Sequence, residues 1–195
     1  MRRLCFGGSF NPIHHGHLIG ARAVAEAAGF DRVVLIPSAL PPHKLRAIGM
    51  APPEHRLAMC RLAVEGDGMF EVDDLELTRS GPSYTIDTAR QMRLRGWPDV
   101  HWLVGADTVP LLPEWHEPDT LLKEVTFVVM ARPGHVLDWP SLPASLRPLQ
   151  KNVAEAPLVE ISASDIRRHV AAGRSVRYLV PPAVEAYLLR NNLYR

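Results

Sequence analysis

Two clusters of polar residues, near opposite ends of the 195-residue chain, carry side chains suited to binding phosphate. The first is His14-His15-Gly16-His17, and the second is Ser162-Ala163-Ser164-Asp165-Ile166-Arg167. Imidazole rings and hydroxyl groups donate hydrogen bonds to phosphate oxygens, and an arginine adds a charged, forked donor. These residue types therefore indicate a site for a phosphorylated ligand such as a nucleotide.

The segment around the first cluster predicts a strand, a glycine-rich loop and the start of a helix. An apolar run at 4–6 ends in Gly7-Gly8, Asn11-Pro12 makes a turn, and a helical pattern covers 17–28. Glycines let the backbone approach a ligand closely, and a helix N-terminus offers N–H groups and the positive end of a dipole. The local structure therefore favours the same phosphate-binding chemistry as the side chains.

The three histidines are expected to have different roles. His14 and His17 are predicted to contact phosphate, while His15, between them, points away from the ligand. One alternative is a metal site, although no Cys, Asp or Glu lies nearby in the sequence as a third ligand. A second alternative is that one histidine only caps the helix.

The second cluster, taken alone, is an ordinary helix start. Serines precede a helical pattern whose first turn contains Asp165, as N-capping prefers. In combination with the first cluster, Ser162 and Ser164 could supply hydroxyls, and Arg167 a guanidinium, to the phosphates of a nucleotide. Arg168 is expected to lie on a solvated face.

The rest of the chain alternates strand-like and helix-like patterns. Strands are expected at 3–6, 32–37, 70–77, 101–105, 126–131 and 158–161, and helices at 17–28, 54–65, 85–95, 118–123, 162–172 and 182–191. Continuously apolar strands are typical of a parallel sheet, whereas 70–77 alternates and is expected at a sheet edge. The order predicts an α/β fold with a doubly wound, mostly parallel sheet and helices on both faces. We expect one domain over 1–195, with the second cluster on the helices of 162–195 and a loop at 133–148.

Composition narrows the class of protein. Lys and Arg number 22 and Asp and Glu 21, so the net charge of +1 gives no overall field that would recruit nucleic acid. No apolar stretch is long enough for a membrane span. Cys5 and Cys60 fall in apolar patterns and are expected to be buried, reduced thiols. We therefore predict a cytoplasmic protein without nucleic-acid or membrane partners, and the sequence leaves a homo-oligomer open.

The motifs resemble those of a known family. Residues 7–17 are similar to the HxGH signature of the nucleotidyltransferases, and residues 161–167 to their ISSTxxR motif. Within that superfamily the bacterial nicotinate-nucleotide adenylyltransferases are the most similar group. Further segments that match them occur in order at 36–44, 81–88, 105–108, 112–115 and 131–134. The resemblance covers nearly the whole chain and implies a Rossmann-like nucleotidyltransferase fold.

Two positions depart from the family pattern. The family usually has Asp where this chain has Asn11, and Ser where it has Ala163. Asparagine keeps the hydrogen-bonding shape of the turn but removes a charge, and Ala163 removes one hydroxyl. Because the histidines and Arg167 are kept, we expect both changes to be tolerated.

The resemblance implies transfer of AMP from ATP to nicotinate mononucleotide, which forms deamido-NAD and releases pyrophosphate. The mononucleotide's 5′-phosphate is the nucleophile, and with a second pKa of about 6 it needs no protein base. Catalysis would then rest on positioning and charge stabilisation, as in phosphoryl transfer generally.

By the same resemblance, His14, His17 and Arg167 are the catalytic residues. The ATP site would comprise Gly7, Gly8, Ser9, Phe10, Gly16, Gly105, Asp107, Ile161, Ser162 and Ser164. Mg²⁺ would bind mainly through the ATP phosphates, without a dedicated set of protein ligands. Asp107, a candidate for the ribose hydroxyls, could alternatively be a helix cap.

The mononucleotide site is expected to contain Lys44, Tyr84, Thr85 and Trp115. Trp115 would stack on the pyridine ring, Thr85 and nearby backbone N–H groups would receive the carboxylate, and Lys44 would reach the phosphate. The alternatives are core or rim aromatics for Tyr84 and Trp115, and a surface lysine for Lys44. Trp97, Trp102 and Trp139 are expected to be packing residues.

Two rival functions stay open on the sequence. An adenylyltransferase of the same fold could prefer nicotinamide mononucleotide, because acid and amide differ by one small group. A non-catalytic nucleotide sensor could keep the fold without turnover, although the intact His14, His17, Ser164 and Arg167 argue against it.

Overall fold

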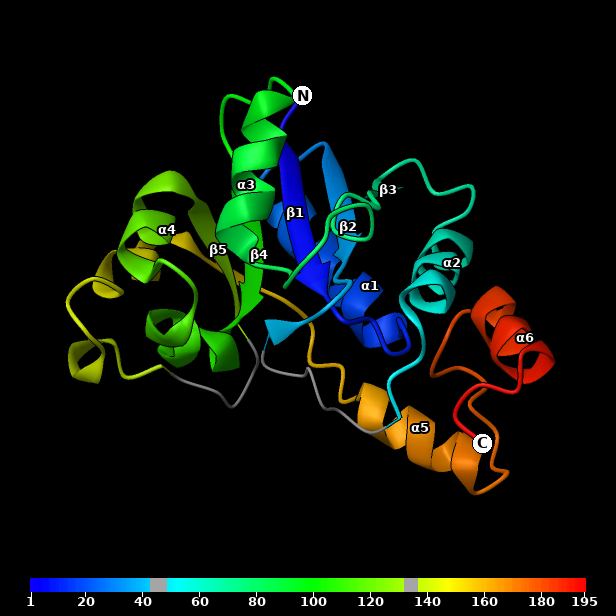
Figure 1. Ribbon diagram of the computed structural model, residues 1–195. Coiled ribbons are helices and arrows are strands. Elements are labelled where there is room, and N and C mark those ends of the chain that lie inside the picture. Colours follow the sequence, from blue (N-terminus) through cyan, green and yellow to red (C-terminus); the bar gives the residue numbers. More distant parts are fainter. Residues whose placement is uncertain (43–48, 132–136) are drawn as a thin grey trace.

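A six-stranded parallel sheet forms the centre of the computed structural model, which describes residues 1–42, 49–131 and 137–195 (Figure 1). The strands are β1 (Arg3–Gly8), β2 (Arg32–Pro37), β3 (Phe70–Val72), β4 (His101–Gly105), β5 (Thr126–Ala131) and β6 (Val153–Glu155). Their order in the sheet is β3-β2-β1-β4-β5-β6, and every neighbouring pair is parallel. The predicted parallel, doubly wound sheet is therefore confirmed.

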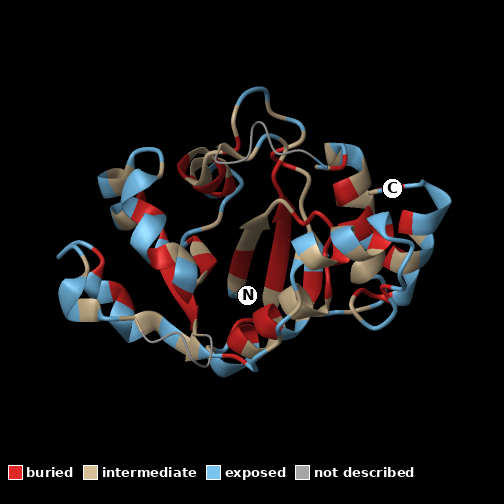
Figure 2. Ribbon diagram, turned by 90° about the horizontal axis from the view of Figure 1, so that it is seen from below, coloured by how far each residue is buried: buried red, intermediate tan, exposed pale blue. Residues whose placement is uncertain are grey.

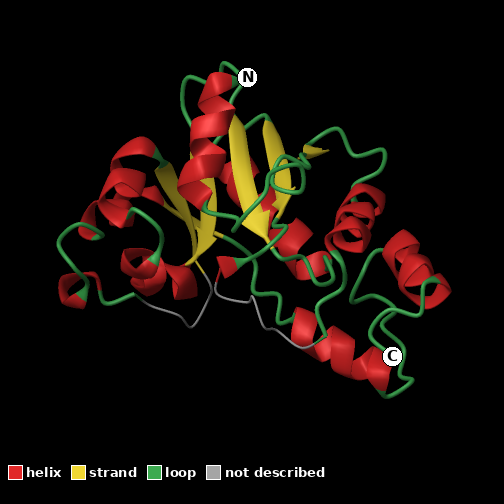
Figure 3. Cartoon of the chain, viewed as in Figure 1, coloured by secondary structure: helices red, strands yellow, loops and turns green. Residues whose placement is uncertain are grey.

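Helices connect the strands and pack against the sheet (Figure 3). They are α1 (His15–Ala27), α2 (Pro53–Ala63), α3 (Thr85–Leu94), α4 (Pro118–Glu124), α5 (Ala163–Ala171) and α6 (Pro182–Arg190), with 3-10 helices η2 (Ala106–Glu114), η3 (Trp139–Ser141) and η4 (Arg147–Asn152). Proline occupies the first turn of α2, α4 and α6, where the missing N–H costs no helical hydrogen bond. Among the described residues, no helix is long and apolar enough to cross a membrane.

The core is divided by the sheet into two layers. Along β1, Leu4 belongs to the cluster that contains residues of α1, α2, α5 and α6, whereas Cys5 belongs to the cluster with α3, η2 and α4. Successive side chains of a strand point to opposite faces, so one buried strand serves both layers. Figure 2 shows the buried strands between exposed helical surfaces. Helices on both faces are thereby confirmed.

The direction in which successive strands are added to the sheet reverses between β1 and β4. The first three strands are laid down outward from β1 in one direction, and β4 then pairs with the other side of β1. In open parallel sheets, ligands bind at the carboxyl ends of strands at such a reversal. Gly7 and Gly8 end β1 and Gly105 ends β4, so the glycines of two motifs meet at this point.

Two expected strands differ from the observed ones. Of 70–77, only Phe70–Val72 pairs with β2, at the predicted sheet edge. Asp73 then accepts the backbone N–H of Leu75 through Oδ1, and the N–H of Leu77 turns back to the carbonyl of Asp74. Such aspartate turns compete with a strand ladder and end it. The last strand is not at 158–161 but at Val153–Glu155, beside β5.

The two cysteines behave as expected from their apolar surroundings. Cys5 and Cys60 are both buried and free. Burial raises the pKa of the Cys5 thiol to about 12. At neutral pH this thiol is protonated and unreactive, so it fills space in the core.

Candidate active site

Two adjoining cavities open at the carboxyl ends of β1 and β4. The larger, of about 1050 Å³, contains residues of both polar clusters, and we call it the histidine cavity. The smaller, of about 760 Å³, contains Tyr84, Thr85, Trp102 and Trp115, and we call it the tryptophan cavity. Both are lined by Phe6, Gly7, Gly8, Ser9, Gly105 and Thr108. The glycine loop of β1 is thus the common wall of the two cavities.

In the histidine cavity, His14 and His17 are stacked on each other. His14 is the N-cap residue of α1, and its ring lies 3.6 Å from that of His17, centroid to centroid. His17 Nδ1 accepts the backbone N–H of His14 at 3.3 Å. A neutral imidazole that accepts at Nδ1 carries its proton on Nε2, which makes Nε2 the donor that a phosphate oxygen requires.

Gly16 makes this arrangement possible. A Cβ atom at Gly16 would lie 3.0 Å from Nδ1 of His14 and 3.1 Å from its Cε1, which is closer than ordinary van der Waals contact. The ring of His14 therefore folds over the glycine of the motif. His15 lines neither cavity, and its backbone N–H donates to the carbonyl of Leu179.

Phe10 supports the second histidine through a ring contact. Its ring centroid lies 5.2 Å from that of His17, in an edge-to-face contact, and it is almost fully buried. The backbone of Phe10 has φ 41°, a left-handed conformation that costs about 1–2 kcal/mol for a residue with a side chain. Gly8 leaves room for the ring, because a Cβ there would approach the ring carbons to 3.2 Å.

The second cluster is a capped helix start that also faces the histidine cavity. The backbone N–H of Asp165 donates to Ser162 Oγ, and the Ser162 hydroxyl donates to the Asp165 carboxylate at 2.7 Å. This hydrogen bond lowers the pKa of Asp165. Ser162, Ala163 and Ser164 all line the cavity, so the capping and the ligand-binding interpretations of this segment are compatible. Arg168 is exposed and pairs with Asp165, as expected of a solvated face.

Arg167 joins the two clusters. One terminal nitrogen donates to the backbone carbonyl of Asn11 at 2.8 Å, and the other donates to Ser164 Oγ at 3.2 Å. Both terminal nitrogens are thus held while the side chain lines the histidine cavity. Residues that are 156 positions apart in the sequence are brought into one site by this contact.

The hydrogen bonds of the Asn11 side chain account for one departure from the family pattern. Its Oδ1 accepts the N–H of Ala51 at 2.9 Å and the hydroxyl of Tyr194 at 2.7 Å. Its Nδ2 donates to the carbonyl of Gly49 at 3.2 Å. A carboxylate at this buried position would lack the donor for Gly49, so the amide suits the surroundings of this chain.

Asp107 follows the end of β4 and lines the histidine cavity. A Cβ at Gly105 would lie 2.4 Å from Oδ1 of Asp107, so the side chain is folded over the glycine. Asp107 lies in the first turn of η2, whose N-cap is Gly105, so it does not cap that helix. In the described part of the chain, no group of three or more His, Cys, Asp or Glu residues could hold a metal ion.

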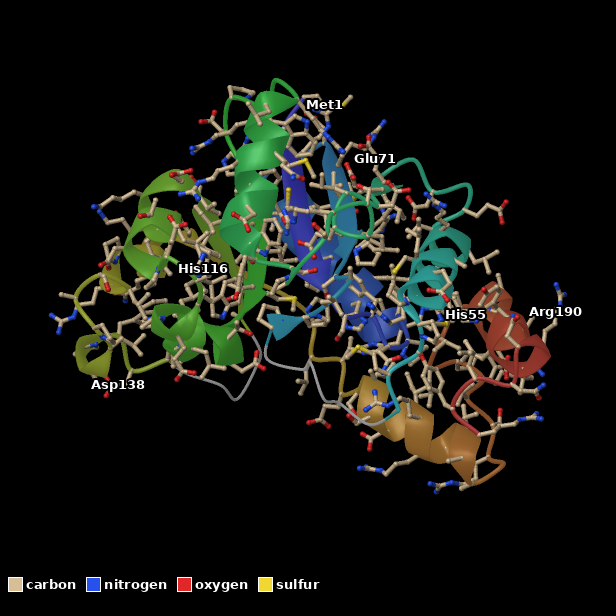
Figure 4. The ribbon with its side chains drawn as sticks, viewed as in Figure 1. Met1, His55, Glu71, His116, Asp138 and Arg190 are labelled. Atoms are coloured by element: carbon tan, nitrogen blue, oxygen red, sulfur yellow. The ribbon has the colours of Figure 1, made fainter. Side chains whose placement is uncertain are left out.

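Several aromatic side chains line the tryptophan cavity. Tyr84 is stacked on His116 with centroids 4.1 Å apart, and Trp115 meets Phe127 edge to face at 6.2 Å. His116 is labelled in Figure 4, beside the segment that leads into α4. Thr85 begins α3 at the same wall. Lys44, the remaining residue expected here, lies outside the described residues.

Trp102, Glu76 and His116 are among the lining residues of this cavity that the sequence did not predict. Trp102 is buried and packs over Gly7, as a packing residue does, yet it also lines the cavity. Glu76 was not predicted because it lay within the strand expected at 70–77. His116 could have been predicted from its position directly after Trp115. Glu76 is buried, accepts the hydroxyl of Thr88 at 2.7 Å, and has a pKa raised by burial.

The chain is similar to known proteins at two levels, a broad class and a family within it. Residues 5–169 match the model of the cytidylyltransferase-like family. Probable nicotinate-nucleotide adenylyltransferases are 42% identical in a Roseiflexus species, over 97% of this chain and 96% of the relative, and 45% identical in Thermus thermophilus, over the whole of both chains. The chain belongs to this cytidylyltransferase-like family and, within it, to the nicotinate-nucleotide adenylyltransferases.

Solved structures agree on the fold. The Plasmodium falciparum nicotinic acid mononucleotide adenylyltransferase complexed with NaAD matches with a TM-score of 0.78 at 18% identity, covering 100% of this chain and 98% of that one. A putative nicotinate-nucleotide adenylyltransferase from Vibrio parahaemolyticus matches with a TM-score of 0.68 at 19% identity, covering 100% and 96%. The predicted Rossmann-like nucleotidyltransferase fold is confirmed.

Proposed function

We propose that the protein transfers AMP from ATP to nicotinate mononucleotide, with release of pyrophosphate and formation of deamido-NAD. One observation carries the proposal: a cavity of phosphate donors and a cavity of aromatic rings share the glycine loop at the end of β1. A triphosphate in the first and a pyridine mononucleotide in the second would meet at that wall. The full-length similarity to nicotinate-nucleotide adenylyltransferases supports the same reaction.

In the proposed reaction, a 5′-phosphate oxygen of the mononucleotide attacks the α-phosphorus of ATP. The bond between the α-phosphorus and the bridging oxygen breaks, and the electron pair leaves with pyrophosphate. His14 and His17 bind the α- and β-phosphates, and the Nε2 proton of His17 stabilises charge as this bond breaks. Ser164 and Arg167 hold the leaving pyrophosphate, while Ile161, Ser162 and the backbone of residues 7–10 complete the ATP site. Asp107 is assigned to the ribose hydroxyls.

Mg²⁺ fits the histidine cavity as a companion of the nucleotide. Glu160 lines this cavity, and Mg²⁺ commonly binds through one or two carboxylates together with phosphates and water, so the ion would bind mainly through the ATP phosphates. When bound, the ion neutralises part of the phosphate charge. Asp165 is engaged with Ser162 and Arg168 and is not assigned to the metal.

In the tryptophan cavity, Trp115 stacks on the pyridine ring and Tyr84, backed by His116, forms a second aromatic wall. Thr85 and the backbone N–H groups at the start of α3 receive the nicotinate carboxylate. Lys44 is assigned to the mononucleotide phosphate by resemblance alone. The two free, buried cysteines suit the reducing cytoplasm, where we place the reaction.

The test is pyrophosphate release from ATP and Mg²⁺ with nicotinate mononucleotide, run beside nicotinamide mononucleotide under identical conditions. Strong preference for the acid is expected. Comparable rates would keep the adenylyltransferase activity and remove the acid-specific role of Thr85. Absence of release with either acceptor, in a protein that binds ATP, would favour the sensor function instead.

A further inference from the structure

A fully buried arginine on α2 connects the loops of the two cavities. Arg56 has 0% of its surface exposed, and each of its three guanidinium nitrogens donates to a backbone carbonyl. The distances are 2.7 Å to Ser9, 3.1 Å to Ala39 and 3.0 Å to Ala51. Burial lowers the pKa of Arg56, and a charge is kept in such a place only by strong compensating hydrogen bonds.

The three carbonyls belong to three different parts of the site. Ser9 lies on the glycine loop that both cavities share. Ala39 follows Ser38, which lines the tryptophan cavity. Ala51 donates its own N–H to the side-chain oxygen Oδ1 of Asn11. The backbone carbonyl of Asn11 in turn accepts from Arg167 in the histidine cavity. One side chain therefore touches the shared wall and a segment of each cavity.

The connection continues from Ala39 to the pyridine side of the tryptophan cavity. The N–H of Ser83 donates to the carbonyl of Leu40 at 2.9 Å, and the N–H of Leu40 donates to Ser83 Oγ at 3.3 Å. Ser83 directly precedes Tyr84 and Thr85. Displacement of Ala39 would therefore move the segment that we assign to the pyridine ring.

We propose that Arg56 is a positioning residue that keeps the two cavities in register for the transfer step. This inference rests on the proposed function. Each substrate is bound by contacts within its own cavity, whereas the attack of one phosphate on the other depends on how the cavities are placed relative to each other. A misplacement of 1 Å between reacting groups can cost about 100-fold in rate. Loss of Arg56 should therefore act on kcat and leave the KM values nearly unchanged.

The variants Arg56→Met and Arg56→Lys test this, with Arg61→Met as the matched control. Arg61 is on the same helix, exposed, and paired with Asp74 at the surface. At saturating ATP and nicotinate mononucleotide, with kcat normalised to the folded fraction, we expect a fall of about 100-fold for Met and about tenfold for Lys. Both KM values should stay within about threefold of wild type. Arg61→Met should match wild type.

A kcat within about threefold of wild type in folded Arg56→Met would overturn the proposal, as would a loss that appears in the KM values alone. If neither variant folds, Ser83→Ala decides, because it removes the hydroxyl that accepts from Leu40, one of the two hydrogen bonds of this tie, while Arg56 remains. A smaller fall in kcat, without a change in KM for ATP, is expected. An unchanged kcat there would equally overturn the proposal.

A second measurement needs no turnover and so separates this inference from the proposed function. A non-hydrolysable ATP analogue, bound in the histidine cavity, should slow hydrogen exchange at the Ser83 amide of wild-type protein and of Arg61→Met. In Arg56→Lys the analogue should still bind but should no longer protect this amide. Equal protection in both would overturn the positioning role, even if the wild type proved inactive toward nicotinate mononucleotide.

Discussion

The histidine cavity and the tryptophan cavity share one wall but are built differently. The first takes its donors from two short, contiguous motifs at the N-termini of α1 and α5, held by Asn11 and Arg167. The second gathers rings and polar groups from β4, η2, α3 and the loops beside them. Phosphate binding needs strong donors in one fixed place, whereas a flat ring can be recognised by surfaces from several elements. Loss of one side chain should therefore have different kinetic consequences in the two cavities.

The largest expected effect is that of His17→Ala in the histidine cavity. Removal of a donor that acts on charge developing in the transition state costs about 100-fold or more in kcat. Pyrophosphate release at saturating substrates measures this. His15→Ala is the control, since His15 lines neither cavity, and it should retain wild-type kcat. A folded His17→Ala enzyme with near-normal turnover would remove His17 from catalysis.

In the tryptophan cavity, Trp115→Ala should instead act on binding. Stacking of a base on an aromatic ring contributes about 1–3 kcal/mol, which corresponds to a rise of about 5- to 150-fold in KM for the mononucleotide. KM for ATP should change far less. Trp139→Ala controls for general loss of aromatic packing, because Trp139 lies on η3 and lines neither cavity. Equal effects on both KM values would place Trp115 outside the pyridine site and erase the contrast between the cavities.

The histidine cavity, built from contiguous motifs, could be predicted from the sequence more fully than the tryptophan cavity, which is built from several elements. The parallel sheet and the grouping of His14, His17 and Gly16 follow from local pattern, because strand, loop and helix start are consecutive. The strand predicted at 70–77 was wrong beyond Val72, because the Asp73 side chain forms a turn with the backbone of Leu75 there. That error also hid Glu76 from the predicted site.

Arg56 could not be recognised from its surroundings in the sequence. Both Arg56 and Arg61 stand on the same helix, and nothing in the local pattern separates them. Their environments are set by tertiary structure: Arg56 meets carbonyls of three distant loops, whereas Arg61 meets Asp74 at the surface. The roles that we assign to the site residues stay predictions until the variants are measured.

The Asn11→Asp variant tests the histidine cavity through the stability of the protein. A carboxylate oxygen would face the carbonyl of Gly49 in place of the Nδ2 donor, and an unsatisfied buried polar group costs about 1–3 kcal/mol. The free energy of unfolding from urea denaturation at neutral pH measures the loss. Asn191→Asp is the control, because Asn191 also donates through Nδ2 to a backbone carbonyl but is exposed, so water can replace the bond. Equal losses in both variants would show that burial of Asn11 is not the cause.

Glu76 provides the smallest expected effect, in the tryptophan cavity. Burial raises its pKa in the folded protein above the value in the unfolded chain. Between these two pKa values the folded state therefore binds more protons than the unfolded state. The free energy of unfolding is then greater at low pH and falls as the pH rises through the pKa of the folded state. Glu76→Gln removes this titration but keeps an oxygen that can accept from Thr88. In urea denaturation, the free energy of unfolding of the wild type should thus fall relative to that of Glu76→Gln between acidic and neutral pH. Glu65 is exposed, so the Glu65→Gln variant should follow the wild type. Parallel stability curves for wild type and Glu76→Gln would mean that the Glu76 carboxyl is ionised at low cost, and that the wall of this cavity is more polar than its aromatic rings imply.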